Sequence, residues 1–94
     1  MEDKAIALLE VQALVAAITG LDAMLKAANV QFICAEKRLG GKLVTVVVEG
    51  SVSAVTAALE AGVAAAAEVG VVKLHEVIPR PPPGLLRFWK KNKA

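Results

Sequence analysis

The fold is decided by residues 34–48, CAEKRLGGKLVTVVV, where two runs rich in apolar residues flank a short charged link. Glycines such as Gly40 and Gly41 reach positive φ angles without steric cost, and β-branched residues pack well on a pleated sheet. The stretch therefore predicts an antiparallel hairpin that turns at the two glycines. Because the link also carries Lys37, Arg38 and Lys42, it offers backbone groups and positive charge together.

The chain before this hairpin predicts a strand and a helix. Residues 5–11 form a short apolar run, whose length favours a buried strand over a helix. Gly20, inside the helix that follows, costs about 1 kcal/mol relative to alanine, which indicates close packing there. From Ala13 onward, apolar residues recur at intervals typical of an amphipathic helix: Leu14, Ala17, Ile18, Leu21, Met24, Leu25 and Ala28.

The hairpin strands lead into a second helix. Residues 30–36 begin with alternating apolar and polar positions, so they supply the first strand, and residues 43–49 supply the second. The hydroxyl of Ser51 or Ser53 can then cap a helix expected over residues 52–68. One face of that helix is apolar and carries Val55, Ala58, Leu59, Gly62, Val63 and Ala66.

A last strand completes the domain. Gly70 fits the left-handed residue that commonly ends a helix, and residues 71–78 alternate as a strand before the prolines of residues 79–84 stop it. The order βαββαβ predicts a ferredoxin-like α+β fold, in which both helices cover one face of an antiparallel sheet. We expect one domain over residues 1–81 and a proline-rich, basic tail over residues 82–94.

Composition favours an oligomer and disfavours a nucleic-acid-binding sheet. The apolar fraction of 56% exceeds the average for globular chains, so a 94-residue domain is expected to cover apolar surface by oligomerisation. An aromatic content of 3% leaves little for base stacking. Without the tail the domain is slightly acidic, because four of the 11 basic residues lie in the tail: Arg87, Lys90, Lys91 and Lys93.

The tail is open to more than one interpretation. It predicts either a disordered terminus or a short amphipathic basic helix. Trp89, together with Leu85, Leu86 and Phe88, can instead dock on a neighbouring surface. A weaker hypothesis is that the positive charge of the tail recruits nucleic acid or cargo.

The sequence contains no constellation for catalysis and no metal-ligand motif. His75 and Glu76 are adjacent on the last expected strand, so their side chains point to opposite faces and do not pair. Cys34 has no disulfide partner, which favours a reducing compartment and a buried apolar role. No signal sequence or apolar run of about 20 residues is visible. We expect a soluble intracellular protein that is not an enzyme and holds no cofactor or metal.

Several segments in register resemble one protein family. These are residues 23–30 (AMLKAANV), Glu36 and Lys37 before the glycine link, residues 43–55 (LVTVVVEGSVSAV), residues 61–66, Val69 with Gly70, and residues 77–81 (VIPRP). Together they resemble the BMC domain of hexameric shell proteins from bacterial microcompartments. The resemblance covers residues 5–81, and several motifs in register are far more specific than any one of them.

The resemblance implies a structural role in the shell of a microcompartment, within the bacterial cytoplasm. Family members form cyclic homohexamers that tile into sheets with other shell proteins, enclose enzymes and pass small metabolites through a central pore. By position, three residues match the edge where hexamers meet: Lys26, Asn29 and Arg80. The hairpin link matches the pore loop: Arg38, Leu39, Gly40, Gly41 and Lys42. Its charge predicts a pore that favours polar or anionic metabolites, with no membrane partner.

Three features differ from the usual family pattern. Residues 37–43, KRLGGKL, are one residue longer than the common Lys-Ile-Gly-Ser-Gly-Leu, so Leu39, the backbone of Gly40 and Gly41, and Lys42 are all candidates for the narrowest point. Ala13 stands where the family has a glycine, which predicts a slightly different turn between strand and helix. The tail matches no family signature.

An alternative function follows from the predicted fold rather than from the shell-protein motifs. A ferredoxin-like domain can serve as a regulator that oligomerises through its sheet edges and binds a small effector between subunits. Oligomeric state separates the two hypotheses, because the regulator is expected as a dimer and the shell protein as a hexamer.

Overall fold

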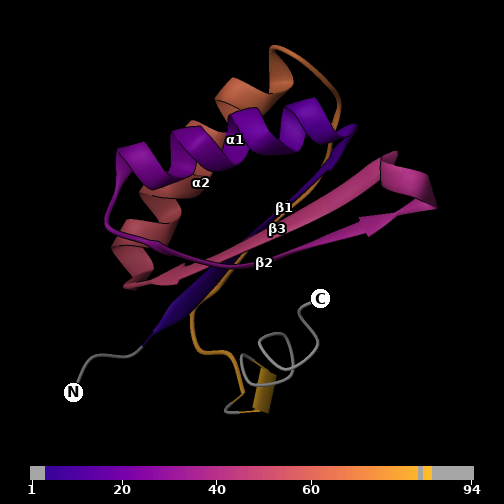
Figure 1. Cartoon of the computed structure of the whole chain (residues 1–94). Helices are drawn as coiled ribbons and strands as arrows, with labels where there is room; N and C mark the ends of the chain where they lie inside the picture. Colours follow the sequence, from indigo (N-terminus) through magenta and orange to yellow (C-terminus); the bar gives the residue numbers. More distant parts are fainter. Residues whose placement is uncertain (1–3, 83, 86–94) are drawn as a thin grey trace.

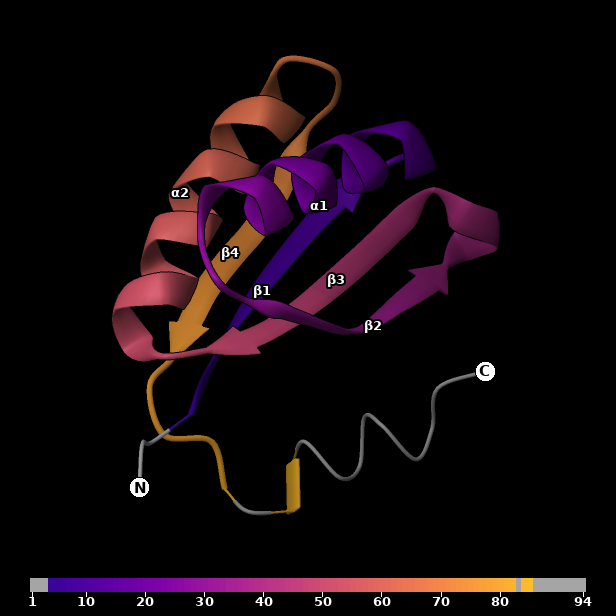
Figure 2. The same ribbon diagram turned by 60° about the vertical axis from the view of Figure 1, so that its left-hand side comes forward.

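The structure is a computed structural model that describes residues 4–82, 84 and 85. Its strands form one antiparallel sheet in the order β2-β3-β1-β4, and both helices cover the same face of it (Figure 1, Figure 2). In chain order the elements are β1 (Ala5–Gln12), α1 (Leu14–Ala27), β2 (Gln31–Arg38), a 3-10 turn (Leu39–Gly41), β3 (Leu43–Gly50), α2 (Val52–Ala67) and β4 (Val72–Ile78).

The predicted ferredoxin-like α+β fold is confirmed, and each element ends within two residues of its predicted bounds. None of the described helices is long and apolar enough to cross a membrane. The division at residue 81 stays a prediction. The expectations for Leu86, Phe88, Trp89 and the basic residues of the tail lie outside the described residues.

The main core lies between the helices and the sheet. Alternate residues of β1 and β3 face the helices, and side chains such as Leu9, Val46 and Val48 are buried there. Met24 from α1 and Val55 from α2 complete this layer, and both are fully buried. The apolar residues that alternate along the strands thus pack against those spaced three to four apart along the helices, and together they form one apolar layer.

Glycines bring the two helices into close contact. A Cβ atom on Gly20 of α1 would lie 2.8 Å from Leu9 Cδ2 and 3.3 Å from the carbonyl oxygen of Gly62. A Cβ atom on Gly62 of α2 would lie 2.5 Å from Met24 Cγ and 3.2 Å from the carbonyl oxygen of Gly20. The close packing that the sequence indicates at Gly20 is confirmed, and Gly62 is its counterpart on the facing helix.

Of the two predictions made for the ends of α2, the one at its start is confirmed and the one after its end is wrong. Ser51 is the N-cap, and its hydroxyl accepts a hydrogen bond of 3.1 Å from the backbone N–H of Ala54. The prediction of a left-handed Gly70 is wrong, because among the described glycines only Gly40 has a positive φ. Gly70 is needed instead for close approach, since a Cβ there would lie 2.7 Å from the Cβ of Ala16.

A second, smaller apolar cluster covers the opposite face of the sheet. A register shift between Phe32 and Cys34 interrupts the predicted alternation of β2, so that the consecutive residues Ile33 and Cys34 are both buried. The predicted buried position of Cys34 is therefore confirmed. The members of this cluster are Ile6, Leu8, Ile33, Cys34, Val47, Ile78 and Leu85.

Candidate functional site

The hairpin link is a tight turn with two consecutive left-handed residues. Leu39 has φ 55° and Gly40 has φ 68°, and the backbone N–H of Lys42 donates to the carbonyl of Leu39 at 3.3 Å. The positive φ expected of Gly40 is found, but the one at Leu39 was not predicted. The Leu39 side chain is 74% exposed, the highest value among the exposed large apolar residues described. In a single chain, this tip therefore has little to pack against.

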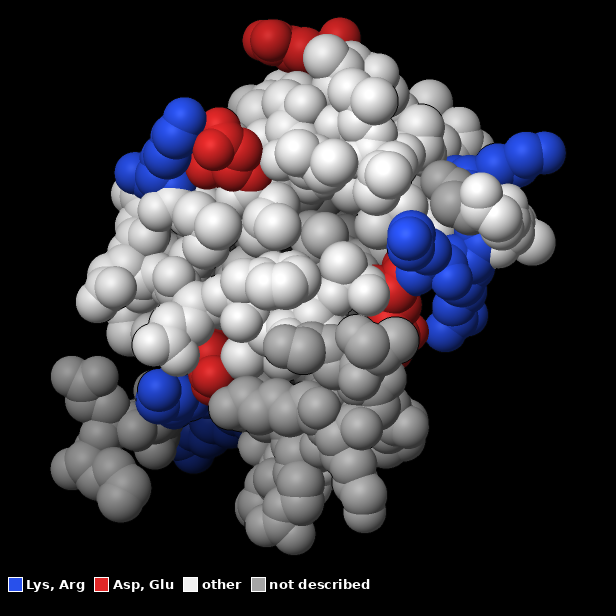
Figure 3. Space-filling view, in the orientation of Figure 1, with Lys and Arg blue, Asp and Glu red and all other residues white. Residues whose placement is uncertain are grey.

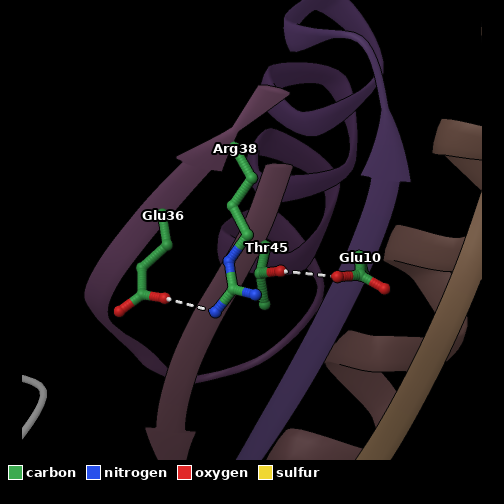
Figure 4. Close-up of polar contacts among 4 residues, drawn as sticks. All are labelled: Glu10, Glu36, Arg38 and Thr45. Carbon is green, nitrogen blue, oxygen red and sulfur yellow. Dashed lines mark hydrogen bonds and ion pairs between the residues drawn. The ribbon is translucent and has the colours of Figure 1, made fainter. Parts of the chain in front are cut away.

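Arg38 is directed toward a carboxylate on its own strand. Its Nη2 atom lies 3.7 Å from Oε1 of Glu36, and both residues project from the face of β2 opposite the helices (Figure 4). On the neighbouring strands, the hydroxyl of Thr45 donates to Glu10 at 3.2 Å (Figure 4). Glu36 therefore offsets part of the positive charge that Arg38 brings to the link.

Lys42 has a different environment. It lines a hollow between the hairpin link and the junction of β1 with α1, together with Gln12, Ala13, Leu39, Leu43 and Lys73. No acidic side chain is among these lining residues, so the two lysines give the hollow a positive potential. The sequence singled out Lys42 but not Lys73, which β4 brings to the same place because Val72 pairs with Val11.

Ala13 ties the start of α1 to the link. Its backbone N–H donates to the carbonyl of Lys42 at 3.1 Å. Its own φ is 78° and its ψ is 144°, a region of backbone space that is unfavourable for a residue with a Cβ atom. Ala13 therefore holds a conformation that glycine adopts more readily, and the difference from the family's turn stays a prediction.

Ala13→Gly is expected to stabilise the protein by about 1 kcal/mol, because the relief of backbone strain exceeds the extra entropy of glycine in the unfolded chain. Urea denaturation at fixed protein concentration measures this change. The matched control is Ala57→Gly, at an exposed position inside α2, which should destabilise by about 1 kcal/mol. A less stable Ala13→Gly protein would show that the turn is not strained.

The three predicted edge residues lie at the other end of the domain. Lys26, in the last turn of α1, has its Nζ 3.0 Å from Oδ2 of Asp22, and the two side chains are 76% and 60% exposed. Asn29 is exposed between α1 and β2, and Arg80 is exposed just after β4. Asn29 also lines a polar hollow with Lys4, Gln31, Glu49, Gly50, Ser51 and Ala54.

Strand pairing sets the distance between the link and these edge residues. Gln12 pairs with Leu43 beside the link, whereas Ala5 pairs with Gly50 at the far end of the same strands. Strands of 8 residues separate the two ends by about 25 Å. In the view of Figure 3, basic side chains gather over the link and again at the opposite margin, with mostly uncharged surface between them.

The residues considered for catalysis do not come together. His75 pairs with Leu9 and Glu76 pairs with Leu8, so the two side chains lie on opposite faces of β4, as predicted. His75 instead borders an apolar groove between α2 and β4, lined also by Thr56, Leu59, Glu60, Val63, Ala64 and Val77. Within the described part of the chain, no three His, Cys, Asp or Glu side chains are grouped so that they could hold a metal ion.

Comparison with known proteins identifies the family. The model of the BMC domain matches residues 5–81. The bacterial microcompartment shell protein PduA of Citrobacter freundii is 52% identical over 81 residues, which are 86% of either chain. The shell protein EutM of Salmonella typhimurium is 45% identical over 78 residues, or 83% of this chain and 80% of that one.

A solved structure gives the same result. A microcompartment protein from Desulfitobacterium hafniense DCB superposes with a TM-score of 0.85 at 30% identity, covering 98% of this chain. This chain spans about half the length of that protein, 49%. With a family match over nearly the whole domain and curated relatives near half identity, the chain belongs to the BMC-domain family of bacterial microcompartment shell proteins.

Proposed function

We propose that this protein is a non-enzymatic tile of a microcompartment shell, which forms cyclic homohexamers that pack edge to edge into layers. The supporting observation is the placement of two residue sets at opposite ends of the sheet: the hairpin link at one end, and Lys26, Asn29 and Arg80 at the other. With the link at a shared axis, the second set reaches the perimeter. The link would then make contacts around the hexamer axis, and the second set would make contacts between neighbouring hexamers.

Exposed apolar surface supports assembly. Val15, Ile18 and Leu39 are 66%, 59% and 74% exposed, and the groove between α2 and β4 is mainly apolar. A single chain gains nothing from leaving such area in water, whereas contacts between copies would cover it. Assembly with other shell proteins around enclosed enzymes belongs to the same proposal.

Oligomeric state tests this proposal directly. Native mass spectrometry is expected to give a hexamer, and electron microscopy of concentrated protein is expected to show flat layers. A stable dimer that never forms a hexamer or a layer would contradict the proposal and would favour the small-molecule regulator instead.

The central pore is proposed to favour polar or anionic metabolites. Lys42 and Lys73 share a hollow without a lining carboxylate, whereas Arg38 is offset by Glu36. Because each subunit contributes one copy, the ring repeats this positive charge around the axis. Lys42 is therefore the link residue whose charge is expected to act most on a passing solute.

Lys42→Glu is expected to lower the anion-to-cation permeability ratio of the pore severalfold, because a repeated positive charge becomes a repeated negative one. The reversal potential of hexamers in a planar bilayer under a salt gradient measures this ratio. Two neutral substitutions give a matched comparison: Lys42→Gln should lower the ratio more than Arg38→Gln, since Arg38 already faces Glu36. Permeation that is insensitive to Lys42→Glu would contradict the assignment.

A further inference from the structure

The hollow beside the hairpin link is large enough to bind a small organic molecule. It has a volume of about 590 Å³, within the range of about 300–1,000 Å³ that is usual for small-molecule sites. The hollow is formed within one chain, by Gln12, Ala13, Leu39, Lys42, Leu43 and Lys73. It therefore does not depend on how copies of the chain assemble.

The sheet places the two lysines of the hollow on either side of one strand end. β1 lies between β3 and β4 (Figure 2), and its last residue, Gln12, lines the hollow. Gln12 pairs with Leu43 on one side, and on the other its backbone N–H donates to the carbonyl of Val71 at 2.9 Å. Lys42 precedes Leu43, and Lys73 follows Val71 by two positions. Two strand spacings separate the lysine backbones by about 10 Å, so their flexible side chains can both reach one anionic group between them.

The charged side chains that line the hollow are all positive. Acidic residues are absent from the described residues that line it. Elsewhere on the sheet, Glu10 accepts a hydrogen bond of 3.2 Å from Thr45. Glu36 lies 3.7 Å from Arg38. Ala13 precedes α1, whose first turn has no acidic residue and no side-chain cap, so the positive end of that helix adds to the same potential. Two lysines without a competing carboxylate match a doubly negative group such as a phosphate monoester.

Apolar groups form much of the remaining wall. Leu39 contributes a side chain that is 74% exposed, and Leu43 contributes one that is half-buried. Leu39 is fixed beside Lys42, because the backbone N–H of Lys42 donates to its carbonyl at 3.3 Å. A ligand with a hydrocarbon body would remove part of this leucine surface from water. The wall therefore favours an organic anion over a bare inorganic one.

We propose that the hollow binds a small organic phosphate. The phosphate group lies between Lys42 and Lys73, where the side-chain amide of Gln12 can donate a further hydrogen bond. The short apolar body of the ligand lies against Leu39 and Leu43. Binding needs one chain only, whereas a role of the site in collecting phosphorylated metabolites beside the pore rests on the proposed function.

Isothermal titration calorimetry of the full chain with n-butyl phosphate, at constant ionic strength, tests the site. Inorganic phosphate, which lacks the apolar body, and butyrate, which carries one charge instead of two, should each bind about tenfold more weakly. Lys73→Gln should weaken the binding of butyl phosphate about tenfold, and Lys73→Arg should preserve most of it. Lys37→Gln removes the same charge at an exposed position of β2 outside the hollow and should leave binding unchanged.

Methyl NMR locates the bound butyl phosphate. The methyl resonances of Ala13, Leu39 and Leu43 are expected to shift, whereas those of Val63 and Val77, in the groove between α2 and β4, should not. Shifts in that groove instead, equal binding of inorganic phosphate, or binding that is insensitive to the loss of the lysine would each overturn the site.

Native mass spectrometry of the same samples reports the oligomeric state separately. A hexamer that binds no butyl phosphate would contradict the site and leave the proposed function standing. Binding by a protein that forms no hexamer would support the site and contradict only its role beside a pore.

Discussion

Replacing Lys26 by alanine is expected to abolish the packing of hexamers into layers while leaving each hexamer intact. Lys26 is 76% exposed, and its recorded ion pair is with Asp22, one turn earlier in the same helix. An exposed pair of this kind stabilises a helix by only about 0.3–0.5 kcal/mol, so the fold loses little. In the proposed layer, by contrast, a long side chain at the perimeter, repeated in every subunit, would act where two hexamers meet.

Electron microscopy and native mass spectrometry separate the two effects of this substitution. Layers should be absent for Lys26→Ala, and the hexamer mass should be unchanged. Asp22→Asn is the matched control, because it removes the ion pair but keeps the lysine; its layers should persist. Layers that persist in Lys26→Ala would overturn the edge assignment, and loss of the hexamer would place Lys26 in a different contact.

The sequence predicted the fold well because local patterns and long-range packing agree. The apolar run of β3, the alternation in β4 and the helical spacing in α1 each specify one element, and a βαββαβ order has few ways to form one sheet. What it missed depends on pairing between strands. The bulge in β2 between Phe32 and Cys34 is set by register against β3, and no periodicity of β2 alone contains it.

The candidate site was predicted less completely, for two physical reasons. Lys73 lies 31 positions after Lys42, and only the pairing of β4 with β1 brings both to one hollow. Leu39 adopts a positive φ that a sequence argument assigns to glycine. The partner of Arg38 could have been predicted from the sequence, however, because Glu36 lies two residues earlier on the same strand and therefore on the same face.

Gly62→Val is expected to destabilise the protein by about 3 kcal/mol, because the added atoms have no room where α2 contacts α1. Even a Cβ atom at Gly62 would lie 2.5 Å from Met24 Cγ and 3.2 Å from the backbone oxygen of Gly20. Met24 is itself fully buried, so its side chain cannot swing into solvent. The helices must therefore separate. A loss of this size is a large part of the free energy of unfolding of a domain of ordinary stability.

Urea denaturation of Gly62→Val, of Met24→Ala and of the double variant tests this cause. Met24→Ala alone should cost about 2–5 kcal/mol through the cavity that it leaves. The double variant should cost less than the two single losses together, because the valine then occupies space that Met24 has vacated. Ala57→Val, at an exposed position of α2, should cost only about 0.5 kcal/mol through helix propensity. Strictly additive losses would mean that the contact between Gly62 and Met24 does not set the helix separation, which would then depend on the backbone of Gly20.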